Sequence, residues 1–207
     1  MTDDYAAAFS ALGAATLGES GGRPMAPRLR PVWRGARVSA PAFPVNCSTA
    51  DTLAIHVAVA EAPAGSVLVV NVGHEPARGY WGEVLTTGAE ARGLRGLVID
   101  GGVRDVDALE AHGFPVFSTM IALRGATKQE PGRVGGTAIV GEVEVARGDW
   151  IVGDADGVTV VPNAHLDDVL AAGRARAEKE EHYFTELRAG RTTMQLLALD
   201  DTPIERD

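Results

Sequence analysis

The sequence predicts an α/β fold built on a largely parallel sheet, with a long helix near the C-terminal end. Short apolar runs of strand length alternate with segments of helical spacing, a rhythm typical of parallel α/β sheets. The apolar runs are residues 66–72, 96–100 and 115–119, and the helical segments between them are residues 80–92 and 105–112. A polar stretch at residues 163–189 predicts the long helix, and 207 residues suffice for a sizeable core.

The N-terminal part of the chain is predicted to contribute a helix and an edge strand. Residues 3–13 have the composition of a short helix, and residues 18–35 are rich in Gly, Pro and Arg, which favours a loop. Residues 36–45 alternate in the manner of a strand. Because proline donates no backbone hydrogen bond, Pro41 and Pro44 favour an edge position for this strand.

The segments that follow are bounded by residues typical of helix ends and turns. Ser48 or Thr49 is expected to cap a helix that continues to about Ala62. The next helix is expected to end at Gly93, because glycine is favoured just beyond helix C-termini. Residues 101–104, Gly-Gly-Val-Arg, are expected to form a turn.

The second half of the chain predicts a compact set of strands followed by the long helix. Residues 137–161 contain the β-prone runs TAIV, EVEV, DWIVGD and VTVVP, separated by Gly and Asp. Asn163 is the expected N-cap of the long helix. The sequence shows neither a linker nor an internal repeat, so residues 1–207 are expected to form a single domain with two packed layers of strand.

Composition excludes several classes of protein. A net charge of −9 disfavours nucleic-acid binding, because phosphate is repelled. The single cysteine, Cys47, excludes an internal disulfide framework and a zinc site built on several thiolates. No run approaches the roughly 18 apolar residues of a membrane span, and the N-terminal segment lacks the features of a signal peptide. We therefore expect a cytoplasmic protein that binds neither nucleic acid nor membrane.

The segment GLVIDGGVRDVDAL, residues 96–109, carries the most informative chemistry. Arg104 and Asp105 open a predicted helix at the end of a buried strand, where ligands gather in open α/β sheets. An arginine can bind a carboxylate through two parallel hydrogen bonds, and an adjacent carboxylate can hold a hard cation such as Mg²⁺. On spacing alone, a surface ion pair in which Asp105 only caps the helix is the more frequent explanation.

An ordered set of further segments resembles a known family. Twenty residues separate Glu83 from the Arg104–Asp105 pair within GEVLTTGAEARGLRGLVIDGGVRD. The segments FPVFS, Lys128, RGDWIVGDADGVTVVP and AEKEE follow in order. Over residues 36–190 this set resembles the RraA-like family, which includes 4-hydroxy-4-methyl-2-oxoglutarate aldolases. The resemblance implies a three-layer β/β/α fold of the swivelling-domain type. The N-terminal third and the stretch after Lys128 depart from the family pattern, which leaves the contacts to the far end of the substrate open.

The resemblance implies roles for residues around the Arg-Asp pair. Asp105 would hold Mg²⁺ or Mn²⁺, with waters in the other positions around the cation. Arg104 would bind the carboxylate of the pyruvyl group. The backbone N–H groups of Val84 and Leu85, which follow Gly82 at the start of a helix, would bind the substrate oxygens.

Charged residues farther away also receive implied roles. Glu83 would orient a metal-bound water that acts as general base. Lys128 would be an electrostatic or structural partner near the pocket rather than a nucleophile. A glutamate from the late helix of a neighbouring subunit would complete the site. Glu180 is the best match for it, with Glu178 and Glu181 as close alternatives. The implied assembly is a homotrimer or a homohexamer of stacked trimers.

The implied activity is a metal-dependent class II aldolase that cleaves 4-hydroxy-2-oxo acids to pyruvate. Decarboxylation of oxaloacetate would pass through the same pyruvate enolate, whose negative charge a divalent cation stabilises. The alternative within the family is a non-catalytic protein that regulates a ribonuclease, which an acidic surface fits. Methyl transfer is disfavoured, because the sequence has no glycine-rich nucleotide loop.

Histidine and calcium sites are disfavoured by spacing. The five histidines lack the paired spacing of metal ligands, and His74 is the one expected nearest the pocket. Asp154, Asp156 and Gly157 resemble part of a calcium loop, but its closing glutamate is absent, so a tight turn is expected.

Overall fold

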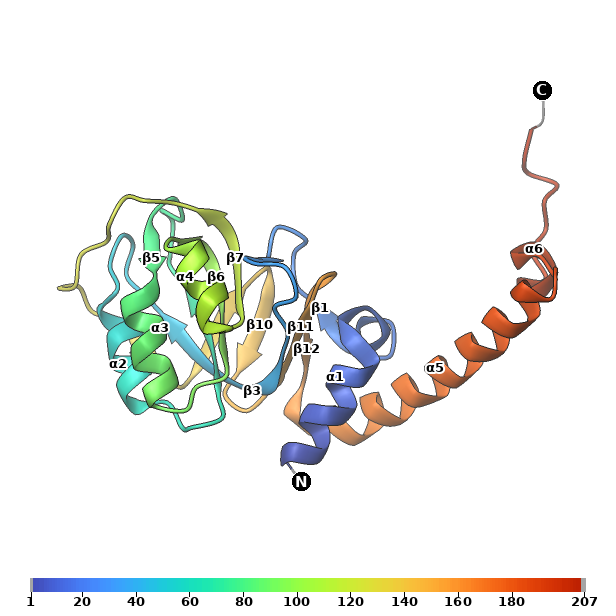
Figure 1. The fold of residues 1–207 in the computed structure, drawn as a ribbon, viewed down its shortest axis with the longest axis horizontal. Helices are drawn as coiled ribbons and strands as arrows, with labels where there is room; N and C mark the ends of the chain where they lie inside the picture. The colour runs from blue at the N-terminus through green and yellow to red at the C-terminus, as the bar shows by residue number, and fades with distance from the viewer. Residues whose placement is uncertain (1, 206–207) are drawn as a thin grey trace.

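The computed structural model describes residues 2–205 and confirms the predicted α/β class with a long C-terminal helix (Figure 1). The helices are α1 (Thr2–Gly18), α2 (Leu53–Glu61), α3 (Glu83–Ala91), α4 (Val106–His112), α5 (Leu166–Arg188) and α6 (Thr193–Leu197), with a 3₁₀ turn η1 (Asn163–His165) before α5. Among the described residues, none of these helices combines the length and apolar character that crossing a membrane requires.

The main sheet has a parallel half and an antiparallel half. Its order is β1-β12-β11-β3-β4-β6-β7-β2, with β5 added to β6 and β8 added to β3, while β9 and β10 form a separate hairpin. The strands are β1 (Arg23–Pro24), β2 (Arg30–Pro31), β3 (Val38–Asn46), β4 (Val67–Asn71), β5 (Gly79–Trp81), β6 (Gly96–Val103), β7 (Val116–Ile121), β8 (Arg133–Val134), β9 (Thr137–Val140), β10 (Val143–Ala146), β11 (Trp150–Asp154) and β12 (Gly157–Val161). β3, β4, β6 and β7 run parallel, whereas β11 and β12 join them antiparallel.

Apolar cores on both faces of the parallel half explain its continuous apolar sequence. Val67 to Val70 of β4 are all fully buried, as expected for a strand covered on both sides. One core lies between the sheet and the helices α2, α3 and α4. The other lies between the sheet and the strands of the hairpin and of the antiparallel half. The layers are therefore helix, sheet and second strand layer, the predicted β/β/α arrangement.

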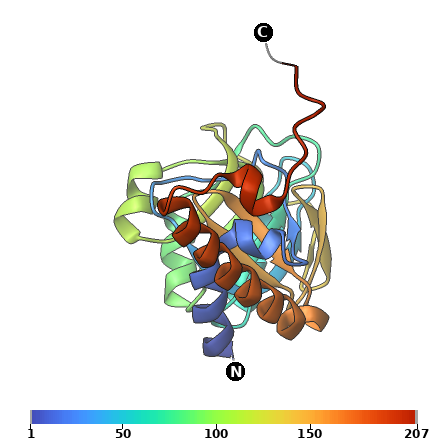
Figure 2. The ribbon, with the colours of Figure 1, turned by 90° about the vertical axis from the view of Figure 1, so that its right-hand side faces the viewer.

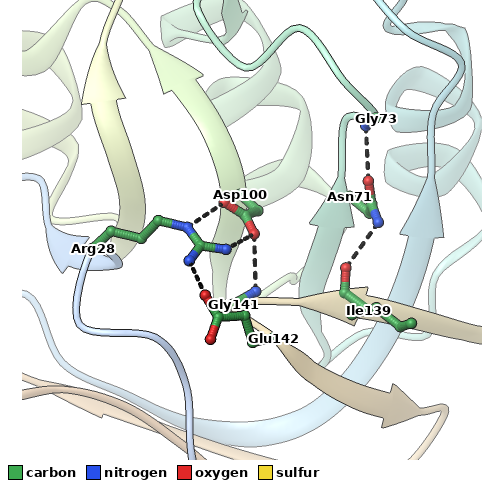
Figure 3. A network of polar contacts seen from close by, with 7 residues as sticks. All are labelled: Arg28, Asn71, Gly73, Asp100, Ile139, Gly141 and Glu142. Atoms are coloured by element: carbon green, nitrogen blue, oxygen red, sulfur yellow. Dashed lines mark hydrogen bonds and ion pairs between the residues drawn. The ribbon is translucent and has the colours of Figure 1, made fainter.

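A row of polar side chains fixes the hairpin to the sheet. Asn46, Asn71 and Asp100 stand in register on β3, β4 and β6. Each makes a hydrogen bond to the backbone of the hairpin at alternate positions, namely Asn46 to the Thr137 carbonyl (2.7 Å), Asn71 to the Ile139 carbonyl (2.8 Å) and Asp100 to the Gly141 amide (3.0 Å). Figure 3 shows the last two contacts. The period of two matches the strand repeat, so the row fixes the register of the hairpin.

Arg28 connects the N-terminal loop to this row. Its guanidinium donates to both carboxylate oxygens of Asp100, at 3.1 and 2.8 Å, and to Glu142 at 2.6 Å (Figure 3). Two parallel hydrogen bonds between a guanidinium and a carboxylate are a strong, geometrically specific contact. The carboxylate of Asp100 therefore binds the N-terminal loop and the hairpin of the second strand layer.

The strand predicted at an edge lies inside the sheet. β3 pairs with β11 through residues 38–41 and with β4 through residues 42–46. Pro41 precedes the first residue paired with β4, and the carbonyl of Pro44 accepts a hydrogen bond from the Gly135 amide on the side away from β4. Neither proline therefore interrupts the β4 ladder, and the edge prediction was wrong for this reason.

Several predicted boundaries also differ from the structure. α1 continues past Gly13 through a kink at that residue (φ 81°, ψ 165°). α2 begins only at Leu53, so neither Ser48 nor Thr49 caps it. Residues 80–81 belong to β5 and not to a helix, and β6 continues through residues 101–103, which were predicted as a turn.

The long helix lies on the side of the sheet opposite α2, α3 and α4. Its first turns pack against α1, where Val169 and Gly173 are buried. The rest of α5 extends away from the sheet and carries α6 at its far end (Figures 1 and 2). Asn163 lies in η1, and α5 begins three residues later than predicted.

Candidate functional site

A cavity of about 270 Å³ opens where β5 and β6 end and where α2 and α3 begin. The predicted site residues that line it are Gly82, Val84, Leu85, Arg104, Asp105 and Lys128. They come from segments that are distant in sequence, and the parallel sheet brings the ends of these segments together. The position agrees with the general preference of ligands for the carboxyl ends of parallel strands.

Asp105 occupies a strained position at the start of α4. Its backbone is left-handed (φ 58°, ψ 40°), which is uncommon for a residue other than glycine. One carboxylate oxygen, Oδ2, accepts a hydrogen bond from the Glu83 amide at 3.0 Å. A Cβ atom at Gly82 would lie only 2.3 Å from this oxygen, so the close approach requires glycine there. The side chain is 42% exposed, and no residue in 2–205 donates to its Oδ1 atom.

Arg104 lies beside this carboxylate but pairs with it only loosely. Its Nε atom is 3.8 Å from Asp105 Oδ2, and its side chain is 45% exposed. Its backbone amide donates to the Trp81 carbonyl at 2.9 Å, which ties the end of β6 to β5. A Cβ atom at Gly79 would come within 3.1 Å of Arg104 Cδ, so glycine there leaves room for the aliphatic part of the arginine side chain. Arg104 therefore keeps hydrogen-bond capacity for a ligand.

The first turn of α3 offers backbone donors to the same cavity. The Thr86 amide is the first to bond within the helix, to the Gly82 carbonyl, and the Glu83 amide is used by Asp105. The amides of Val84 and Leu85 therefore have no acceptor within the helix. Together with Arg104 and Lys128, these helix-start donors make the cavity attractive to an anion such as a carboxylate.

The carboxylate of Glu83 does not line the cavity. Its Oε1 atom is 3.6 Å from His112 Nε2, and His112 Nδ1 is 2.7 Å from Glu90 Oε2. Glu83 therefore contributes its backbone to Asp105 and directs its side chain towards a histidine on α4. Because its side chain is 57% exposed and the contact exceeds hydrogen-bond length, this orientation is weakly held.

Some cavity residues were missed or misjudged from sequence. His56 lines the cavity, whereas His74 does not. Burial lowers the pKa of His56, and the nearby Lys128 ammonium lowers it further. Thr52 lines the same side, and the adjacent Asp51 is 1% exposed. These residues lie just before α2 or in its first turns. Because the helix was predicted to start at Ser48 or Thr49, they were not recognised as residues at a helix start.

The donor set fits a hard cation that keeps most of its water. Among residues 2–205, no group of three or more His, Cys, Asp or Glu side chains could hold a metal ion. Mg²⁺ and Mn²⁺ can be held by one or two carboxylates plus water and substrate oxygens, and the free Oδ1 of Asp105 meets that need.

The late-helix glutamates lie away from the cavity of their own chain. Glu180 forms an ion pair with Arg176 within α5, with Oε1 2.8 Å from Nε. Figure 1 places α5 on the far side of the sheet from α3 and α4. Glu178 and Glu181 belong to the same helix and likewise do not line the cavity.

Comparisons with known proteins agree with the geometry of the fold. The family model described as RraA-like, Aldolase/RraA, matches residues 6–160, a range that begins and ends earlier than the expected 36–190. A relative from Halalkalibacterium halodurans, named "Putative 4-hydroxy-4-methyl-2-oxoglutarate aldolase", is 32% identical over 74% of this chain and 73% of its own. An uncharacterized protein from Pseudomonas syringae superposes with a TM-score of 0.83 at 26% identity, over 94% of this chain and 93% of its own. The RNA-processing inhibitor RraA from Thermus superposes with a TM-score of 0.65 at 23% identity, over 72% and 92%.

Proposed function

The chain belongs to the RraA-like family, Aldolase/RraA, and on that premise we propose that it is a divalent-metal-dependent lyase. The proposed reaction cleaves a 4-hydroxy-2-oxo acid to pyruvate, and oxaloacetate decarboxylation is proposed as a second reaction with the same product. One observation carries the proposal. The half-exposed carboxylate of Asp105, the Arg104 guanidinium and the unpaired amides at the start of α3 face a single cavity.

Binding of the substrate follows from the charges in the cavity. Arg104 binds the carboxylate next to the keto group, because a guanidinium can donate two parallel hydrogen bonds to it. The amides of Val84 and Leu85 donate to the remaining oxygens at the helix start. Lys128 also lines the cavity and adds positive charge. The donors therefore favour a small dianionic or monoanionic 2-oxo acid.

Cleavage of the carbon–carbon bond leaves negative charge on the keto oxygen as the pyruvate enolate forms. A Mg²⁺ or Mn²⁺ ion held by Asp105 would supply Lewis-acid stabilisation of that charge. Arg104 lies close enough to Asp105 to add to the stabilisation without being neutralised by a tight pair, since Nε and Oδ2 are 3.8 Å apart.

During retro-aldol cleavage the substrate hydroxyl loses a proton as its oxygen becomes a carbonyl, and the enolate takes up a proton at carbon to give pyruvate. We assign the removal of the hydroxyl proton to Glu83, whose carboxylate follows Gly82 at the start of α3. Its side chain is exposed and lies 3.6 Å from His112, so it can turn towards the cavity when substrate is present. Decarboxylation of oxaloacetate has no such proton to remove and should depend less on Glu83.

The assembly proposed with this function is a homotrimer or a homohexamer. In it, Glu180 from α5 of a neighbouring subunit approaches the cavity. The support is that α5 projects away from its own sheet and keeps only its first turns in contact with α1. Light scattering gives the number of chains, and Glu180→Gln is expected to lower activity in the assembled protein without changing that number.

The test is a screen of 2-oxo acids for pyruvate formation, coupled to lactate dehydrogenase. The expected result is pyruvate release that needs Mg²⁺ or Mn²⁺ and stops when EDTA is added. Oxaloacetate and 4-hydroxy-2-oxo dicarboxylates are the first compounds to include. Pyruvate release at an unchanged rate in EDTA, or none from any compound with either metal, would contradict the proposal.

A second candidate is a non-catalytic regulator that binds a ribonuclease. It is supported by the fold shared with the RNA-processing inhibitor from Thermus and by the net charge of −9. Inhibition of a purified ribonuclease, together with the absence of pyruvate chemistry, would favour this candidate. The free Asp105 carboxylate inside a cavity favours the lyase, since a docking surface has no need of it.

A further inference from the structure

Asp51 is a buried carboxylate behind the cavity that the proposed chemistry does not use. It lies just before α2 and is 1% exposed. Its Oδ1 atom accepts from the Leu53 amide at 2.7 Å, in the first turn of the helix. Its Oδ2 atom accepts hydrogen bonds from the segment that carries Lys128, namely from Thr127 Oγ1 (2.7 Å), the Gln129 amide (2.7 Å) and the Glu130 amide (3.1 Å).

These contacts hold the residues that precede and follow Lys128 in the sequence. The donors to Oδ2 are Thr127, Gln129 and Glu130, so the residues before and after the lysine are fixed to one oxygen atom. The backbone adds two more bonds, because Thr127 and the segment before α2 exchange hydrogen bonds in a short bridge. They join Thr52 N to Thr127 O at 2.8 Å and Thr127 N to Ala50 O at 2.9 Å.

Other hydrogen bonds hold only the two ends of this segment, namely the backbone exchange at Thr127 and a bond from Ser48 Oγ to the Pro131 carbonyl (2.5 Å). The side chains from Thr127 to Glu130 are exposed, and the segment belongs to a long connection between β7 and β8 that forms no regular structure. A loop with few buried apolar contacts depends on its hydrogen bonds for a defined conformation. Between these two ends, Asp51 supplies the acceptor for the amides of Gln129 and Glu130 and so orders the residues directly after Lys128.

We propose that Asp51 is a positioning residue that holds Lys128 in the cavity, so that the ammonium group meets the substrate. This inference rests on the proposed function for the part played by Lys128. The positioning acts through backbone geometry, since Asp51 reaches the lysine by way of its neighbours in the chain. Asparagine has nearly the same shape as aspartate, but its NH₂ group would face the backbone amides that now donate to the carboxylate. Two donors cannot form a hydrogen bond, so Asp51→Asn should release the loop.

The first experiment combines Asp51→Asn with Lys128→Met and measures kcat/KM for pyruvate formation. Asp51→Asn is expected to lower kcat/KM by about 10- to 100-fold, because small displacements of a binding group have effects of this size. In the Lys128→Met background, the same substitution is expected to lower kcat/KM by less than about threefold, because residues that act through each other are not additive. Equal effects of Asp51→Asn in both backgrounds would overturn the proposal.

The matched control is Asp149→Asn. Asp149 is 6% exposed, and its carboxylate also clamps backbone amides, those of Ala146 and Asn163, in the antiparallel half of the molecule. The substitution makes the same chemical change far from Lys128. It is expected to lower stability but to leave kcat/KM within about threefold of wild type. A loss as large as that of Asp51→Asn would show a general structural effect and overturn the proposal.

A second measurement does not depend on activity. The sequence contains only two lysines, Lys128 and Lys179, so reductive methylation with ¹³C gives one NMR signal for each side chain. In Asp51→Asn the Lys128 signal is expected to move to the position of a freely mobile lysine, while Lys179 on α5 stays in place. An unmoved Lys128 signal would overturn the proposal. Absence of pyruvate formation by wild type would instead count against the proposed function alone.

Discussion

Two aspartates at helix starts, Asp105 in the lining of the cavity and Asp51 behind it, differ in almost every physical respect. Asp51 is 1% exposed and accepts hydrogen bonds through both oxygens from α2 and from the loop that carries Lys128. Asp105 has a 42% exposed side chain, accepts from the Glu83 amide through one oxygen and occupies a left-handed backbone conformation. A carboxylate whose two oxygens both accept hydrogen bonds stabilises the site, whereas a carboxylate with a free oxygen is available to bind a ligand.

The low pKa of Asp51 reflects the hydrogen bonds that its carboxylate accepts. Burial by itself would raise this pKa, but the hydrogen bonds from Gln129, Leu53, Thr127 and Glu130 outweigh burial and lower it to about 2. Hydrogen bonds to the charged form favour that form, so Asp51 stays ionised throughout the range in which the protein would act. Its contribution is therefore to folding and geometry.

The largest expected effect belongs to Asp105→Asn. Because Asn tolerates the left-handed conformation and the side chain is half-exposed, the free energy of unfolding should change by less than about 1 kcal/mol. Pyruvate formation should fall on the order of 1,000-fold, since several kcal/mol of charge stabilisation is lost. The lactate dehydrogenase assay and thermal unfolding measure both. If Asp105→Asn kept the activity of wild type, Asp105 would not be the aspartate that binds a ligand, and the proposed difference between the two aspartates would be wrong.

Gly82→Ala is the next test, because it displaces the Asp105 carboxylate without touching it chemically. The backbone of Gly82 is extended (φ −168°), so alanine is allowed there, but its Cβ atom would lie 2.3 Å from Asp105 Oδ2. We expect kcat/KM to fall about 100-fold, as a displacement of about 1 Å does elsewhere.

Gly88→Ala is the matched control for this substitution in the same helix. A Cβ atom there would meet Val59 Cγ1 at 3.5 Å, an ordinary contact. It should leave kcat/KM unchanged and raise stability by up to about 1 kcal/mol, because alanine is the better helix former. Similar losses in both variants would show that α3 tolerates no added methyl group, and would remove the specific role given to Asp105.

Asp51→Asn should show its effect on stability and on pH dependence. Asp51 is buried and accepts four hydrogen bonds, and hydrogen bonds to a charged group contribute about 1.5–3 kcal/mol each, so the free energy of unfolding should fall by at least about 2 kcal/mol at neutral pH. The folded pKa is lowered from 3.8 to about 2. The stabilisation is therefore fully present above pH 3.8 and is lost as the pH falls towards 2. Urea unfolding between pH 7 and 2 should show wild type and variant converging at acid pH, and a constant difference would contradict this.

The smallest expected effect belongs to His112→Gln. His112 contacts the exposed carboxylates of Glu83 and Glu90, and exposed pairs of this kind contribute about 1 kcal/mol or less. Retro-aldol kcat/KM should therefore change by less than about fivefold, a change that steady-state kinetics resolves. A loss comparable to that of Asp105→Asn would place the histidine in the chemistry and widen the site beyond the two aspartates.

The sequence predicted the part of the site that is contiguous in the chain and missed the part made by tertiary contact. The strand–helix rhythm indicated Arg104 and Asp105, and the family resemblance implied Val84 and Leu85; all four line the cavity. Asp51 meets the segment around Lys128 only through the fold, across more than seventy residues. No local pattern marks such a contact.

The errors in the fold have similar physical causes. The edge position of β3 was inferred from Pro41 and Pro44, but both prolines turn their missing donors away from the β4 ladder. The start of α3 was placed too early because Tyr80 and Trp81 continue its spacing, whereas the sheet takes them as β5. In both cases pairing in the sheet overrode a local preference.

The most direct test of the account is a Mn²⁺ titration followed by electron paramagnetic resonance on wild type, Asp105→Asn and Asp51→Asn. If Asp105 is the carboxylate that anchors the cation, its substitution should weaken Mn²⁺ binding by at least about 10-fold, while Asp51→Asn stays within about threefold of wild type. Mn²⁺ binding by Asp105→Asn with the affinity of wild type would contradict the account.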